Sequence, residues 1–289
     1  MRKVGSTTDT ADANGEYTNG NVAQGIPPTI INAEMLNTFQ RELVNIVEGA
    51  GISLDPSNDS QVLEAVRKLL SPGRLLNVKT FTTSGTYTPT PGTKSIIVEG
   101  VGGGGGSGGS FKTQTGYYTG TGGGGAGGYF KTRLTSLPNS VTISIGKGGK
   151  GGIGGASPTA GENGGQTSFG TFAQASGGNG SSPSQPAVNS GVAYQLGSGF
   201  GGFATGGNIL NSRGGDGSAS LIVRNGSGVS GAGGASHFDV GGSSQPWSNS
   251  GNAGGVGSGG GGSIHQDGNA VQPDGGDGGD GIIVVYEYA

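Results

Sequence analysis

Two histidines are the side chains best suited to acid–base chemistry in this sequence. His237 and His265 each lie two residues before an aspartate, Asp239 and Asp267. A histidine–carboxylate pair can act as a general acid or base. Both histidines lie in polar, glycine-rich sequence, however, which predicts solvated loops. We find no catalytic constellation and expect a protein that is not an enzyme.

Three further patterns resemble ligand-binding motifs but lack the context that such motifs need. Lys147 and Lys150 lie among glycines, yet neither is followed by the Ser or Thr of a phosphate-binding loop. G-x-G-x-x-G patterns arise by chance in such a chain. Residues 275–283 match one calcium β-roll nonapeptide, a fold that needs tandem copies. The sequence therefore predicts no cofactor and no metal.

The composition divides the chain into two regimes. Of its 289 residues, 70 are glycine, and between Gly100 and Gly281 about one residue in three is glycine. Hydrophobic residues make up only 30%, so an ordinary core fits only in the first third and in a thin layer beside the glycines. The absence of cysteine excludes disulfides and cysteine-ligated zinc. A net charge of −3 without a basic cluster argues against nucleic acid as a partner.

The sequence also bears on membranes and export. No stretch is long and apolar enough to span a membrane, so we expect no membrane insertion. Arg2 and Lys3 are not followed by the apolar run of a signal peptide. If the protein works outside a cell, we expect it to leave by lysis or inside a particle.

The glycine-rich stretch allows three interpretations. Collagen needs sustained Gly-X-Y and abundant proline, and there are only 12 prolines. Disorder is typical of glycine-rich sequence, but strand-like segments interrupt this one. In "GKGGKGGIGG" and "GGDGGDG", which begin at Gly146 and Gly275, two of every three residues are glycine. This spacing favours polyglycine-II helices, which have three residues per turn and can pair backbone to backbone.

Strand patterns surround and interrupt the glycines. Residues 77–100 alternate Thr, Phe and Tyr before an Ile-Ile-Val run, and Val141, Ile143 and Ile145 alternate cleanly. A weaker pair of strands is expected within "QTSFGTFAQASGG" (166–178) and a short strand near Leu221, and 282–288 form a closing strand. The expected fold is mixed: a small α-helical N-terminal region, then a β-sheet or β-sandwich layer with an inserted bundle of polyglycine-II helices at about 100–281.

The first 74 residues are expected to hold an arm and two helices. Residues 1–31 are polar and turn-rich, which predicts an extended arm. Apolar residues at helical spacing predict helices at 33–49 and 59–71, within a two-helix region at 32–74. Two helices this short cannot bury their apolar faces well against each other, so we expect them to pack on copies from other chains as well. The β and glycine-rich domain then occupies 75–289.

Aromatic side chains gather in the segments between glycine blocks, which we expect to be turns at the ends of the bundle. Rigid aromatics among Ser, Asn and Gly are typical of binding loops. An alternative is that some rings only cap the bundle. The candidate receptor-binding residues are Tyr117, Tyr118, Tyr194, Phe200, Phe203, His237, Phe238 and Trp247.

Two parts of the sequence resemble phage proteins. The stretch from "ADANGEYTNGNVAQGIPPTIINAEML" to "QVLEAVRKLL", within residues 1–72, resembles the N-terminal segment of tail fibres of contractile-tailed phages and prophages. The stretch from "FTTSGTYTPTPGTKSIIVEGVGGGGG" to "GGDGGDGIIVVYEY" is similar to the glycine-rich domain that ends many phage tail proteins. In style its glycine blocks also resemble tip adhesins of T-even-like phages.

The resemblance implies a homotrimeric fibre in the virion, made in the host cytoplasm. Its N-terminal region would bind the tail or baseplate, and its tip would bind lipopolysaccharide or an outer-membrane protein. A spacer without receptor binding is the main alternative. An ice-binding protein would want a flat Thr/Ala face, and a polysaccharide depolymerase would need a long β-helix and paired carboxylates; neither pattern is visible.

Overall fold

The computed structural model describes residues 2–70, 73–188, 193–195, 197–223 and 227–289, and for 193–195 only the backbone. The chain forms two compact units, Met1–Arg74 and Leu75–Ala289. The described part is mostly β-sheet with two α-helices, which confirms the mixed helix-and-sheet class.

The first unit contains the two expected helices. α1 spans Ala33–Gly49 and begins at Asn32, whose side-chain oxygen accepts a hydrogen bond from the Met35 amide at 3.0 Å. α2 spans Gln61–Leu70. The helices share a small core of Val47, Ala50 and Ala65, with Ile46, Ile52 and Val62 packed against it.

Much of the apolar surface of these helices stays exposed within one chain. Leu36 and Leu43 of α1, and Leu63, Leu69 and Leu70 of α2, are each about half exposed or more. The segment expected as an extended arm holds two short 3-10 helices, Val4–Ser6 and Val22–Gln24. The unit therefore offers an unburied apolar surface on both helices.

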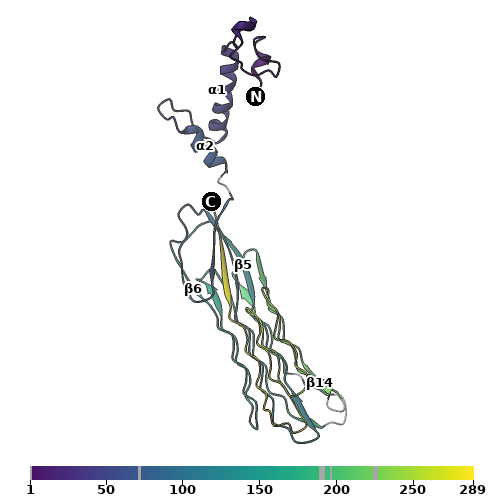
Figure 1. Ribbon diagram of the computed structural model, residues 1–289. Helices are drawn as coiled ribbons and strands as arrows, with labels where there is room; N and C mark the ends of the chain where they lie inside the picture. Colours follow the sequence, from purple (N-terminus) through teal and green to yellow (C-terminus); the bar gives the residue numbers. More distant parts are fainter. Residues whose placement is uncertain (1, 71–72, 189–192, 196, 224–226) are drawn as a thin grey trace. The chain divides into compact units, whose positions relative to one another are not determined.

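At one end of the second unit, two antiparallel five-stranded sheets form a β-sandwich. Figure 1 labels one strand of each sheet, β5 and β6. We call this the sandwich end. In order, the first sheet contains β1 (Leu75–Phe81), β16 (Ile282–Tyr288), β3 (Ser95–Val101), β5 (Tyr129–Leu134) and β12 (Leu210–Ser212). The second contains β11 (Ala204–Thr205), β8 (Ala173–Ala175), β7 (Thr167–Phe169), β6 (Val141–Ser144) and β2 (Gly85–Tyr87). Both sheets contribute to one core, which includes Ile96, Val98, Phe130, Ile283, Tyr87, Ile143 and Phe169.

A buried carboxylate ties the closing strand to the second sheet. Glu287 of β16 is fully buried and accepts hydrogen bonds from the Tyr87 hydroxyl at 2.8 Å and from the Thr90 hydroxyl at 2.6 Å. The Lys79 ammonium lies 3.2 Å away. Burial alone would raise the pKa of Glu287, but these donors outweigh it and hold the pKa below its usual value.

From the sandwich, glycine-rich segments run to the opposite end of the unit, which carries β14 in Figure 1 and which we call the far end. Residues 102–110 are all buried, and their amides pair with a different neighbour at each successive residue. Gly102 and Gly105 donate to carbonyls in 121–128, Gly103 and Gly106 to 159–166, and Gly104 and Ser107 to 274–281. The same segment accepts hydrogen bonds from 146–155, 176–186 and 258–263. Its partners thus repeat every third residue.

These contacts leave no room for side chains. A Cβ added at Gly149 would clash with the backbone carbonyl of Glu162, and one at Gly278 with that of Gly104. The same holds for the glycines of 102–109 and 122–128, where the nearest atoms are almost all backbone. Glycine is therefore required here by close approach rather than by flexibility.

Charged residues follow the same repeat on one side of these segments. Asp274, Asp277 and Asp280 accept hydrogen bonds from the amides of Gly154, Gly151 and Gly148, at 2.7–2.8 Å. Lys150 pairs with Asp277 and Lys147 with Asp280, each at 2.8 Å. Both aspartates of the stretch that matched a calcium nonapeptide, Asp277 and Asp280, are thus already engaged by an amide and a lysine each.

The far end is built from strands rather than from the turns that we expected. β10 (Ala193–Gln195), β13 (Ser220–Val223) and β14 (Ser227–Val229) form one three-stranded sheet. β15 (Ile264–Gln266), β4 (Tyr117–Gly120) and β9 (Ala187–Val188) form another. Single bridges from Pro246 to Val229 and from Asn249 to Ile264 join the two through residues 246–249. The sequence predicts only one of these strands, β13 near Leu221, and the others are too short and too polar to show a strand pattern.

Substituting the packed glycines should destabilise the second unit. We expect Gly149→Ala or Gly278→Ala to lower the free energy of unfolding by about 1–3 kcal/mol or more, because each Cβ meets a fixed carbonyl, and valine to do so further. The control is Gly197→Ala, where an added Cβ would make only ordinary contacts. Thermal and denaturant unfolding measure the change. Equal stability of all these variants would mean that the glycines are linkers.

Glu287 should make stability depend on pH. Its pKa is lower in the folded than in the unfolded chain, so its contribution is complete above the usual glutamate pKa of about 4.3 and is lost as the pH falls below it. We expect Glu287→Gln to cost about 3 kcal/mol at pH 7, with a smaller gap from wild type at pH 3. The exposed Glu162→Gln is the control, and a gap that stays constant with pH would contradict this role.

Candidate functional site

The eight candidate residues separate into two groups within the second unit. Tyr117 and Tyr118 lie in β4 and Trp247 in the bridging segment, all at the far end. The Tyr194 backbone belongs to β10, and its side chain lies outside what the structure describes. Phe200, Phe203, His237 and Phe238 lie instead beside the sandwich. Phe203 directly precedes β11, and the ring of His237 stacks on Tyr129 of β5.

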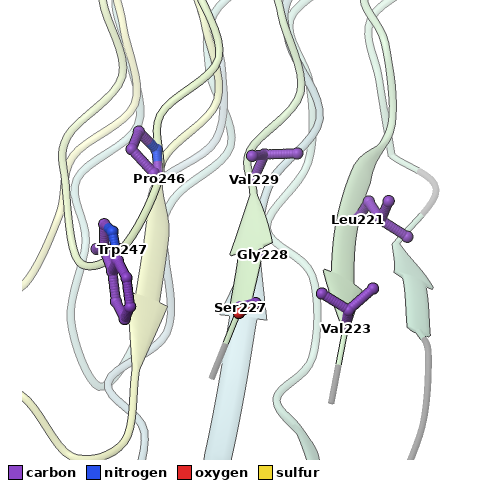
Figure 2. A pocket seen from close by; sticks show the side chains of 7 residues that line it. All are labelled: Leu221, Val223, Ser227, Gly228, Val229, Pro246 and Trp247. Carbon is purple, nitrogen blue, oxygen red and sulfur yellow. The ribbon is translucent and has the colours of Figure 1, made fainter. Parts of the chain in front are cut away.

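Trp247 borders an open hollow of about 330 Å³ at the far end (Figure 2). Its floor is the face of the β13–β14 hairpin, where Leu221 pairs with Val229 and Val223 with Ser227. Pro246 and Trp247 form the wall beside β14. The side chains that line the hollow are thus almost all apolar.

The conformation of Trp247 is unusual for its type. Its φ angle is +61°, a region that large side chains rarely adopt, and its side chain is 64% exposed. Such backbone conformations cost about 1–3 kcal/mol, persist only where the surroundings hold them, and cluster at binding sites. The segment is held on both sides: Ser230 donates to the Gln245 carbonyl at 2.9 Å, and Asn249 exchanges two backbone hydrogen bonds with Ile264.

The two tyrosines of β4 differ in exposure. Tyr117 is 39% exposed and borders a second hollow of about 230 Å³, together with Lys112, Gln114 and Pro186. Tyr118 is only 5% exposed and belongs to the interior of the far end. Of this pair, only Tyr117 is accessible to a ligand.

His265 lies in this interior too, and the prediction of a solvated loop is wrong for it. Its side chain is fully buried in β15. Nε2 lies 2.9 Å from the Asn269 carbonyl, which can only accept, so Nε2 carries the proton and Nδ1 accepts from the Thr113 amide at 3.3 Å. Asp267 does not face it as a catalytic partner and accepts instead from the Gly116 amide at 2.7 Å. Both side chains fix the loops around the second hollow.

A comparison with protein families finds a match over most of the chain. A model described as a glycine-rich domain matches residues 80–288. The chain belongs to this glycine-rich domain family. No curated protein matches the sequence.

The glycine-rich domain starts within the second unit and ends at its closing strand. Among the described residues, no helix is long and apolar enough to cross a membrane, and no group of three His, Asp or Glu side chains could hold a metal ion.

The sequence pointed to Trp247 by its type alone, and it missed the hairpin that forms the floor beside it. Leu221 and Val223 were expected only as part of a short strand, and nothing linked that strand to residues 246 and 247. The alternation of Leu221, Val223 and Val229 around a polar hairpin was the available signal. This alternation does not indicate which glycine segments place Trp247 beside the hairpin.

Truncating two far-end aromatics should change the stability of the protein by very different amounts. We expect Tyr118→Ala to lower the free energy of unfolding by about 3 kcal/mol, because it empties a buried position. Trp247→Ala should change it by no more than about 0.5 kcal/mol, because that ring is mostly in solvent. Thermal unfolding separates the two, and a larger loss for Trp247 would place its ring in the core.

Proposed function

We propose that this protein is a tail fibre or receptor-binding protein of a phage or prophage virion, and that it recognises the host surface at the far end of its glycine-rich domain. The observation that carries the proposal is the Trp247 hollow: an exposed, apolar, strained site at the end to which the glycine segments run. The resemblance of residues 1–72 to tail-fibre N-termini supports the same assignment.

We further propose that the glycine segments form a bundle of polyglycine-II helices. The threefold rotation of backbone partners along 102–107 and the exclusion of a Cβ at the glycines of 102–109 support this geometry. Such a bundle is cross-linked in every direction by backbone pairs, so it would hold the far end rigidly at a distance from the sandwich. A rigid support lowers the entropy lost when a surface binds.

Recognition at the far end would use a few exposed rings. Trp247 and Tyr117 border separate hollows and are exposed, which suits them as contact residues. Trp and Tyr dominate binding energy at many interfaces because they bury a large area with few rotatable bonds. The partner would be lipopolysaccharide or an outer-membrane protein of the host.

The first unit is proposed to attach the fibre to the tail or baseplate and to join three copies. The half-exposed leucines on α1 and α2 are the support, since a single chain leaves them in water. Three copies would also present three far ends, so weak single contacts could combine into firm attachment.

A spacer role is the second candidate, and the rigid glycine packing would serve it equally well. The two functions differ at the far end, because a spacer needs no exposed tryptophan there. Cell binding therefore discriminates between them.

We expect fluorescently labelled protein to bind at least one strain in a panel of bacteria, which would be its host. Trp247→Ala should weaken this binding about thirtyfold, the effect of losing an interfacial contact of about 2 kcal/mol. The matched control is Ile153→Ala, which removes a 67% exposed side chain from a glycine segment. Thermal melting checks that both variants fold. Binding that survives Trp247→Ala would move the site elsewhere, first to Tyr117, and binding to no cell in the panel would favour the spacer.

We expect the intact protein to be a trimer by light scattering at micromolar concentration. Leu43→Ser combined with Leu69→Ser should yield smaller species, because the apolar surface on both helices would be interrupted. A wild-type monomer would contradict the proposed assembly.

A further inference from the structure

One residue of the second group of candidate aromatics, His237, lines a polar hollow that the far-end proposal does not use. This hollow of about 230 Å³ lies beside the sandwich, between residues 212–214 and 235–237, with Gly127 and Tyr129 also lining it. Its side chains include Arg213, His237 and Ser212. Unlike the Trp247 hollow, it is lined by groups that donate hydrogen bonds, one of them cationic.

Arg213 is held in place from several sides. Its guanidinium carbon lies 5.3 Å from the ring centre of Phe203 and 5.9 Å from that of Phe200. Nη2 donates to Asp216 at 2.6 Å, and Nε lies 3.3 Å from the Gly201 carbonyl. These contacts leave the remaining N–H groups of the guanidinium for a ligand. An arginine fixed in this way loses little side-chain entropy on binding.

Three carboxylates lie near the hollow, and that of Asp239 accepts hydrogen bonds from the amides of Val240 and Val256. Asp216 accepts from Arg213 and also from the Gly201 amide at 2.7 Å. Glu99, close to Tyr129, pairs with Lys131 at 2.8 Å. None of these carboxylates lines the hollow, so an incoming anion would not contact a negative charge there.

His237 supplies a flat ring beside Arg213. It stacks on Tyr129 with ring centres 3.7 Å apart and planes 20° apart, and Phe238 packs edge-on against both rings. Burial, followed by Glu99 and Tyr286, raises the pKa of Tyr129 to about 12, so this support stays uncharged. Among the described residues, neither ring nitrogen of His237 makes a hydrogen bond, so both remain open to a ligand.

We propose that this hollow binds a carboxylate-bearing pyranose, a sugar acid of the uronic type. The carboxylate would accept hydrogen bonds from Arg213, as arginine and carboxylate groups commonly pair. The ring hydroxyls would meet His237 and the Ser212 hydroxyl, which can accept. The volume lies below the roughly 300 Å³ at which sites for drug-sized ligands begin, so it suits one sugar ring.

Calorimetric titration of the intact protein with glucuronate tests the proposal. We expect a Kd on the order of 1 mM, and binding at least about tenfold weaker for glucose, which lacks the charge, and for acetate, which lacks the ring. Arg213→Gln should weaken glucuronate binding at least about tenfold. Arg133→Gln, an exposed arginine of the adjoining strand β5, should leave it unchanged.

Nuclear magnetic resonance of the wild-type protein removes any dependence on how well Arg213→Gln folds. Glucuronate should shift the ring signals of His237 and leave the indole signal of Trp247 in place. No binding, equal affinity for glucose or acetate, or shifts at Trp247 alone would overturn the proposal. Cell binding through Trp247 would be unaffected by that result, because the two hollows lie at different ends of the domain.

Discussion

Hydrogen bonds between glycine backbones are the constraint on which the rest of this structure depends. Along 102–110 the chain has almost no side chains with which to build a core, yet every residue is buried. Its amides and carbonyls find partners in neighbouring segments, and at its glycines the partner fits only because no Cβ intervenes. The large entropy loss of ordering glycine is offset by these pairs rather than by apolar burial.

Such packing determines where ordinary side chains can go. At the sandwich end, two sheets enclose Phe130, Ile143 and their neighbours, and this core fixes the ends of the glycine segments. At the far end, two small sheets do the same around Ile222, Ile264 and His265. On the outside, the aspartates at every third position accept amides at the edge of the packing. Chemistry is therefore confined to the two ends and to a few outer faces.

Much of the architecture was predictable from local pattern. The helices at 33–49 and 61–70, the strands around Ile143 and the closing strand follow from periodicity. Apart from β13, the far-end strands did not, since a segment such as Ile264–Gln266 becomes a strand only beside β4, more than a hundred residues away in sequence. For the same reason the candidate site was only half predictable. Trp247 was identified by its residue type. That Phe203 and His237 lie at the other end of the domain depends on which segments pair, and glycine repeats carry no information about pairing partners.

Amide hydrogen exchange resolved to individual glycines tests the central claim most directly. If the glycine segments pair backbone to backbone, the amides of Gly103, Gly104 and Gly105 should exchange as slowly as those of β3 and β16, that is, only on global unfolding. The amide of Gly92, in an exposed turn at the sandwich end, should exchange rapidly and serves as the internal reference. Exchange of the three segment glycines at the rate of Gly92 would contradict the account, because it would place their amides in water.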